Sequence, residues 1–243
     1  MKKILMIALM LLSVASYAVA QTGQVKRRFV MDGENGKVDS CYMFINFKDD
    51  DFDFLQMNVN IVKKDSVVSF TRAEISENPK HYFGYKSPKR EVEDLRNMLD
   101  TLKIKLQEWS VTAKENHVTS FSKSFGKKKD VPIFYLTGIF NGCTYHNNGY
   151  PVAGCEPMFK VDDKGCCTVS FELSRPVKRR TGVSKGTGWQ DTEHYDVEIA
   201  YAKFRFSTPE QIQGLIDALD LETAKQELVK QSTENNKIDS LFK

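Results

Sequence analysis

Two neighbouring stretches of strict apolar alternation limit the fold of this chain more than any other feature of its sequence. The alternating apolar positions are Cys41, Met43, Ile45 and Phe47 in the first stretch, and Leu55, Met57, Val59 and Ile61 in the second. A period of two is that of a β-strand with one buried face. A third strand is expected from about Val67 to Ile75, and turn sequences such as Asp49 to Asp51 separate these segments. The N-terminal part therefore predicts a meander of three or four antiparallel strands.

A first helix is expected after this meander. It should begin at Ser87 and Pro88, a capping residue followed by the residue favoured at the first helical position. From Val92 to Trp109 the apolar residues recur at spacings of three and four, which places them on one stripe. A helix lying on a sheet accounts for that stripe. A coiled-coil partner helix is the alternative, but the repeat is short for one.

A second helix is expected from Thr208 and Pro209, where Gln211 stands at the position that completes a capping box. Its apolar stripe should break or bend near Asp220, and residues 231–243 are expected to form a frayed C-terminal tail. Between the helices, further strands are expected over residues 117–125, 131–140, 158–161, 167–173 and 195–206. In the last of these the apolar positions change from odd to even numbers after Tyr201, which predicts a β-bulge.

The order of these elements predicts an α+β fold in which antiparallel sheet carries two main helices packed on one side. Both parts of the chain have strands followed by a helix, and this suggests a duplicated unit with halves 21–115 and 116–230. The two halves together form the single domain expected over residues 21–230. No glycine-rich phosphate loop follows a strand, which argues against a nucleotide-binding α/β fold.

Residues 1–20 have the pattern of a bacterial export signal. Lys2 and Lys3 precede an apolar run from Ile4 to Leu12, and small residues lead to a cleavage site expected after Ala20. The apolar run is too short to span a bilayer, so no transmembrane segment is expected in the mature chain. We therefore expect export of the chain to the periplasm, the outer surface or the medium. A net charge of +3 over the whole chain argues against a nucleic-acid binder.

The five cysteines all follow the export signal: Cys41, Cys143, Cys155, Cys166 and Cys167. In an oxidising compartment we expect a disulfide, with Cys143, Cys155 and Cys166 as the candidates. A zinc site formed by these three and His146 is a weaker hypothesis because no second close ligand pair is present, and no metal or cofactor is predicted. A cysteine nucleophile with His146 or His194 as base is weaker still, because no protease signature occurs. Alternation places Cys41 and Cys167 on buried faces.

Aromatic and basic residues gather in two segments that the sequence predicts to be loops, residues 141–155 and 175–191. Flat rings, amides and guanidinium groups suit a sugar, a peptide or an acidic surface. The alternative is that these aromatic rings pack at the ends of the sheet core and bind no ligand. The candidate ligand-binding residues are Tyr145, His146, Tyr150, Arg179, Arg180, Trp189 and His194.

The sequence thus predicts an exported, non-catalytic binding or interaction protein for a glycan, a peptide or a cell-envelope component. An exported hydrolase with a Cys/His site is one alternative, and a structural component of a cell-surface assembly is another.

Overall fold

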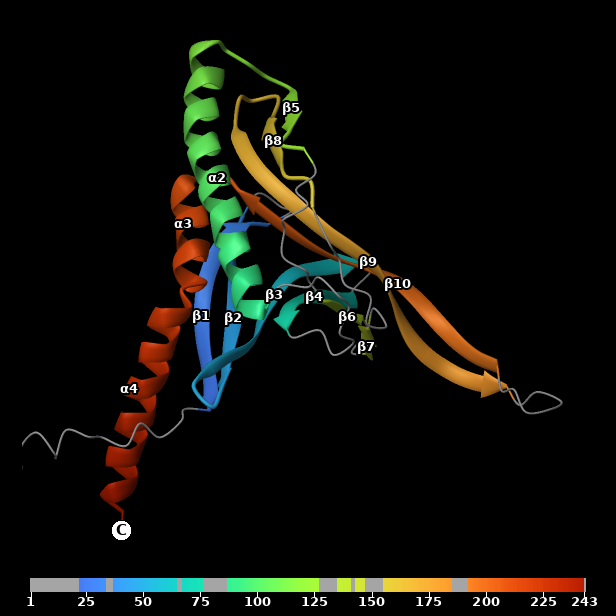
Figure 1. The fold of residues 1–243 in the computed structure, drawn as a ribbon. Helices are drawn as coiled ribbons and strands as arrows, with labels where there is room; N and C mark the ends of the chain where they lie inside the picture. Colours follow the sequence, from blue (N-terminus) through green and yellow to red (C-terminus); the bar gives the residue numbers. More distant parts are fainter. Residues whose placement is uncertain are drawn as a thin grey trace, which may run out of the picture.

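The structure is a computed structural model that describes residues 22–33, 37–64, 67–76, 87–126, 135–140, 143–146, 155–184 and 192–242. The strands of this part form one antiparallel sheet with the order β1-β2-β3-β4-β6-β7-β9-β8-β5, and β10 pairs with β9 (Figure 1). With three helices beside it, the chain has the predicted α+β fold. The predicted export signal lies outside the described residues.

The N-terminal meander has four strands, β1 (Gly23–Asp32), β2 (Val38–Lys48), β3 (Asp51–Lys64) and β4 (Val67–Ser76). Of these four strands, only β1 was not assigned a range from the sequence. Asp49 and Asp50 join β2 to β3 with φ values of 50° and 69°. Two consecutive residues with positive φ are characteristic of a type I′ hairpin turn, whose twist matches that of the strands. Asp49 and Asp50 therefore form a turn as predicted, whereas Asp51 is the first residue of β3.

The three helices are α2 (Pro88–Glu115), α3 (Pro209–Ala218) and α4 (Leu221–Ser240). The first residues of α2 and α3 agree with the local sequence signals. Ser87 caps α2, and Thr208 with Gln211 forms a complete capping box at α3. The break predicted near Asp220 separates α3 from α4. The segment predicted to fray is instead helical to Ser240, with hydroxyl groups that bond carbonyls of the preceding turn.

The later strands are β5 (Phe121–Ser124), β6 (Tyr135–Phe140), β7 (Cys143–His146), β8 (Met158–Val161), β9 (Cys167–Ser184) and β10 (Thr192–Phe206). Two differences from the sequence prediction matter. Residues 143–146 form a strand inside a predicted loop, and β9 continues to Ser184 instead of ending near Leu173. Because β4 pairs with β6, one sheet includes strands from both predicted halves.

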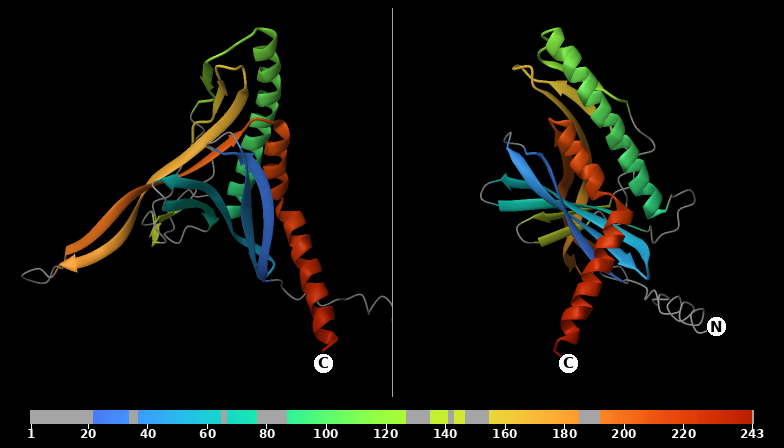
Figure 2. Two further views of the ribbon diagram at one scale, coloured as in Figure 1. Left: turned by 180° about the vertical axis from the view of Figure 1, so that it is seen from behind. Right: turned by 90° about the vertical axis from the view of Figure 1, so that its left-hand side faces the viewer.

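The core lies between the helices and one face of the sheet, which we call the inner face. It holds the predicted alternating residues of β2 and, in β3, Leu55, Met57 and Val59, whereas the side chain of Ile61 lies outside the described part. The rings of Phe171 and Phe204 stack 4.5 Å apart in this core. Arg27 of β1 reaches from this face to the Asp217 carbonyl of α3 and to Glu227 of α4. All three helices cover this side of the sheet (Figure 2).

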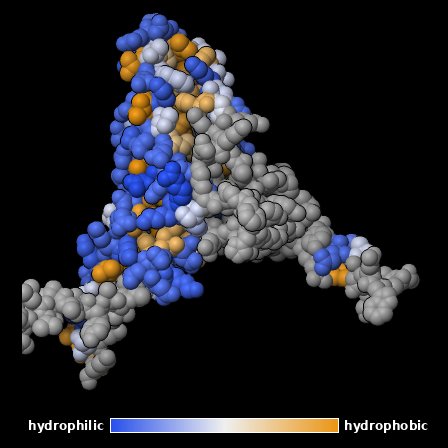
Figure 3. All heavy atoms as spheres, viewed as in Figure 1, coloured by the Kyte–Doolittle hydropathy of each residue, from blue (hydrophilic) through white to orange (hydrophobic). Residues whose placement is uncertain are grey.

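The exposed side of the helices is largely hydrophilic, with isolated hydrophobic residues such as Ile104 and Val111 (Figure 3). No helix in the described part of the chain is both long and apolar enough to cross a membrane. The helices therefore leave two other surfaces to consider as binding sites, the opposite face of the sheet and the long hairpin of β9 and β10.

Candidate binding surfaces

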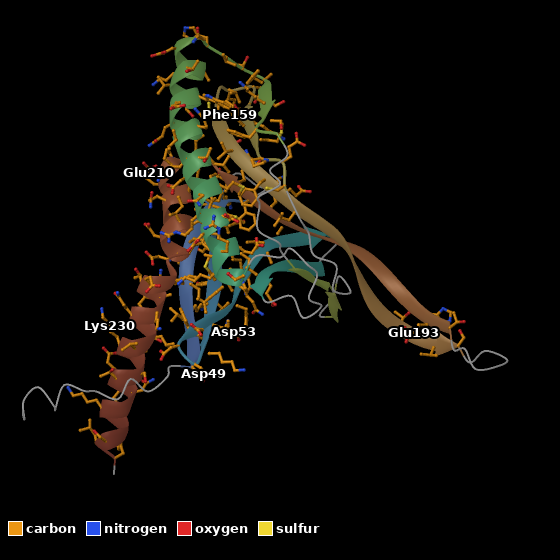
Figure 4. All side chains as sticks on the ribbon, viewed as in Figure 1. Asp49, Asp53, Phe159, Glu193, Glu210 and Lys230 are labelled. Atoms are coloured by element: carbon orange, nitrogen blue, oxygen red, sulfur yellow. The ribbon has the colours of Figure 1, made fainter. Side chains whose placement is uncertain are left out.

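The outer halves of β9 and β10 form a two-stranded hairpin that extends beyond the other strands (Figures 1 and 2). We call its residues 174–184 and 192–201 the hairpin arm. Glu193 lies near its far end (Figure 4). The prediction that Arg175 to Lys185 form a loop is therefore wrong as far as Ser184, because these residues pair with β10. Within this pairing Pro176 lies opposite Ile199.

The register of the hairpin arm shows which residues share a face. Pairing with β9 is uninterrupted from Tyr195 to Phe206, and the one register shift of β10 lies between His194 and Tyr195. The β-bulge predicted after Tyr201 is therefore absent from this described strand. Successive residues of a regular strand lie on opposite faces, so the apolar side of β10 changes faces at Tyr201 and Ala202.

The change of face lies next to two buried pairs of residues. Leu173 pairs with Ala202 and Phe171 with Phe204, and all four are buried on the inner face. Beyond this point the positions on the opposite face form an apolar and aromatic row, which we call the arm stripe. Its members are Tyr195, Val197, Ile199 and Tyr201.

Charges are also divided between the two faces of the hairpin arm. Lys178 pairs with Val197 and Arg180 with Tyr195, so two basic residues belong to the face of the arm stripe. On the other face Arg179 pairs with Asp196. The arm stripe is thus flanked by basic residues, while acidic residues of β10 occupy the opposite face.

The predicted ligand-binding residues are only partly brought together. His146 of β7 pairs with Lys178 of β9, which places the end of β7 beside the strand that carries Arg179 and Arg180. Tyr145 precedes His146 in the same strand. Two predicted residues, Tyr150 and Trp189, lie wholly outside the described part of the chain. Four more have side chains outside it, namely Tyr145, His146, Arg179 and Arg180.

His194 is the one predicted ligand-binding residue whose side chain is described. It is exposed near the end of the hairpin arm, and its Nε2 contacts Ser184 Oγ across the two strands. A serine beside a histidine is one part of a nucleophilic site, which also needs an orienting group and water exclusion. An exposed position on a two-stranded hairpin gives little exclusion of water, so we assign this pair to hairpin structure.

The cysteines occupy different environments. Cys41 and Cys155 are buried, and burial raises the pKa of each thiol to about 12. Cys155 Sγ lies 3.8 Å from Met98 Sδ. Cys166 is exposed, whereas Cys167 packs partly against the core, as alternation predicts. No cysteine pair is found among the described side chains, which do not include Cys143, so the disulfide stays a prediction.

Neither chemical alternative gains support from these positions. A nucleophilic or zinc-binding cysteine acts as a thiolate, and a pKa near 12 keeps Cys155 protonated at neutral pH. Within the described residues, no group of three or more His, Cys, Asp or Glu side chains is placed to hold a metal ion.

A second surface was not predicted from the sequence. The outer face of β1, β2 and β3, opposite the helices, carries three aromatic rings among basic and amide side chains. We call this surface the aromatic face, and its residues are Gln24, Lys26, Arg28, Tyr42, Phe44, Asn46, Phe54, Gln56 and Asn58. The signal was present in the sequence, since Tyr42, Phe44 and Phe54 interrupt what would otherwise be a polar outer face.

Comparisons of the chain with protein-family models, with curated proteins and with solved structures find no match. Its function is therefore argued from the two surfaces above.

Proposed function

We propose that this chain is an exported, non-catalytic binding protein that holds a glycan, peptide or cell-envelope partner along its hairpin arm. The observation that carries this proposal is that the apolar positions of β10 change faces at Tyr201 and Ala202, next to the buried pair of Leu173 and Ala202. A two-stranded ribbon is marginally stable by itself because it buries little surface. An apolar row on the face opposite the core is therefore best explained by contact with another molecule.

The distribution of charge supports a partner that carries negative groups. Lys178 and Arg180 share the face of the arm stripe, whereas Asp196 and Glu198 belong to the other face. A partner with apolar and acidic groups would match the first face. Basic residues at the edge of an interface mainly direct association and orientation, while buried rings supply most of the affinity.

Face-matched variants test this proposal. Val197→Ser with Ile199→Ser changes the arm stripe, and Asp196→Ser with Glu198→Ser changes the other face at neighbouring positions of the same strand. The assay is cosedimentation of each purified protein with envelopes from a strain that lacks the gene. We expect the first pair to weaken binding by about tenfold, which corresponds to about 1.4 kcal/mol, and the second to leave it nearly unchanged.

Thermal unfolding of each variant provides the control for folding. Equal loss of binding in both pairs would contradict a role for the arm stripe, as would a wild-type protein that does not sediment with envelopes. An envelope-dependent activity that depended on a thiol or on His194 would favour the hydrolase alternative. Self-association lost only in the first pair would favour a structural component of a surface assembly.

A further inference from the structure

The aromatic face is built from three rows of residues that run across β1, β2 and β3. Lys26 pairs with Phe44, which pairs with Gln56, and this is the central row. The neighbouring rows are Gln24, Asn46 and Phe54 on one side, and Arg28, Tyr42 and Asn58 on the other. Each row therefore contains one aromatic ring and at least one amide side chain, on strands that are about 4.8 Å apart.

The aromatic rings of this face are accessible. Tyr42 is 40% exposed, and Phe44 and Phe54 are half-buried among their neighbours. Tyr42 and Phe44 stand two residues apart on β2, and Phe54 is diagonal to Phe44 on β3. An aromatic ring offers a flat apolar surface, which fits the C–H face of a pyranose ring.

Two amides of the face have unused hydrogen-bonding capacity. Asn46 accepts a bond of 2.9 Å from Gln24 Nε2, but its own Nδ2 has no partner, and neither has Asn58 Oδ1. Both atoms are shielded from solvent, and an unpaired buried donor or acceptor costs about 1–3 kcal/mol. Reorientation of these amides toward the hydroxyl groups of a ligand would recover part of that free energy.

The charged residues of the face are basic, and no acidic partner of theirs lies among the described residues. Lys26 Nζ lies 4.0 Å from the centroid of the Tyr42 ring, and Arg28 donates to Ser40 Oγ at 2.6 Å. No carboxylate in the described residues forms an ion pair with either. Glu74, next to this face on β4, instead accepts a hydrogen bond from Gln56. Two cations without an ion-pair partner in the described part of the chain, next to the rings, favour a ligand with negative charge.

We propose that the aromatic face is a binding site for an acidic glycan whose sugar units carry carboxylates. Pyranose rings stack on Tyr42 and Phe44, the amides bond the hydroxyl groups, and Lys26 and Arg28 bind the carboxylates. A nucleic acid fits less well, because two basic residues neutralise few phosphates. The site lies on different strands from the hairpin arm, so this proposal stands or falls independently of the proposed function.

Isothermal titration calorimetry of the full chain tests this proposal. The probes are short oligomers of galacturonate, of mannuronate, and of alternating glucuronate and N-acetylglucosamine, with the neutral galactose oligomer as reference. We expect at least one acidic oligomer to bind about tenfold more tightly than the neutral one. Arg28→Gln should remove most of this preference, because the side chain stays polar and loses its charge.

Substitutions at exposed residues distinguish a loss of binding from a loss of folding. Tyr42→Ala removes an exposed ring, and we expect it to weaken binding of the acidic oligomer by about tenfold at an unchanged unfolding temperature. Lys160→Gln changes an exposed lysine of β8, away from this face, and should have no effect. Failure of all three acidic oligomers to bind would overturn the proposal. Binding that is equal for the neutral oligomer, or unaffected by Tyr42→Ala, would also overturn it.

Discussion

The surroundings of the two buried thiols, Cys41 and Cys155, determine how reactive each thiol is. Cys41 is 6% exposed on the inner face of β2, and Asp39 adds to burial in raising its pKa. Burial alone raises the pKa of the Cys155 thiol. Protonated thiols are poor nucleophiles and poor metal ligands. Cys166 differs because it follows a tight turn in which Asp162 Oδ1 accepts its backbone N–H, and its side chain is exposed.

Alkylation should therefore distinguish the thiols. With iodoacetamide at pH 8 and under reducing conditions, we expect Cys166 to be modified in the native protein, and Cys41 and Cys155 only after unfolding. Peptide mass spectrometry with and without denaturant checks this. Rapid native modification of Cys155 would contradict its burial and reopen the hypothesis of a reactive cysteine.

The same thiols predict how stability changes in alkali. A thiol whose folded pKa is raised from 9.0 to about 12 contributes stability that is present below pH 9. That contribution is lost as pH rises toward 12, because the unfolded thiol ionises first. We expect a Cys155→Ala variant to lose less stability between pH 8 and pH 10.5 than the wild type, measured by urea unfolding. An equal loss of stability in the variant and the wild type over this pH range would contradict the raised pKa of Cys155.

At the scale of helices and strands, local signals predicted the beginnings of α2 and α3 because a cap depends on residues within one turn. Asp220 is a further cap that the sequence prediction recognised only as a break. Its Oδ1 accepts the backbone N–H of Thr223 at 3.0 Å, and this bond lowers the pKa of the carboxyl group. Arg96, 3.9 Å away, acts in the same direction.

Replacement of this cap should have an effect that depends on pH. We expect Asp220→Ala to lower the free energy of unfolding by about 1 kcal/mol at pH 7, and Asp220→Asn to cost less because the amide oxygen still caps. A carboxyl group with a lowered folded pKa contributes stability above its unfolded pKa, and that contribution is lost as pH falls through the folded pKa. The gap between wild type and Asp220→Asn should therefore narrow below about pH 4. Urea unfolding at pH 7 and pH 3 checks both expectations.

Over the whole molecule, the sequence predicted what alternation and caps determine, namely the inner face of β2 and β3, the helix starts and the α+β class. It failed at the hairpin arm because a change of apolar face after Tyr201 has the same local pattern in a bulge and in a regular strand. Only pairing with β9 distinguishes the two. The aromatic face was missed because alternation was used to find buried residues, while Tyr42 and Phe44 occupy the intervening positions.

The central claim is that the hairpin arm binds and is not needed for folding. The most direct test removes residues 176–199 and joins Arg175 to Ala200, which pair in the intact protein, through an Asn-Gly turn. This deletion removes three of the four residues of the arm stripe together with Arg179, Arg180, Trp189 and His194. We predict that the shortened protein unfolds within about 4 °C of the intact protein and sediments with envelopes at least about tenfold more weakly. Undiminished envelope binding by the folded, shortened protein would contradict the account.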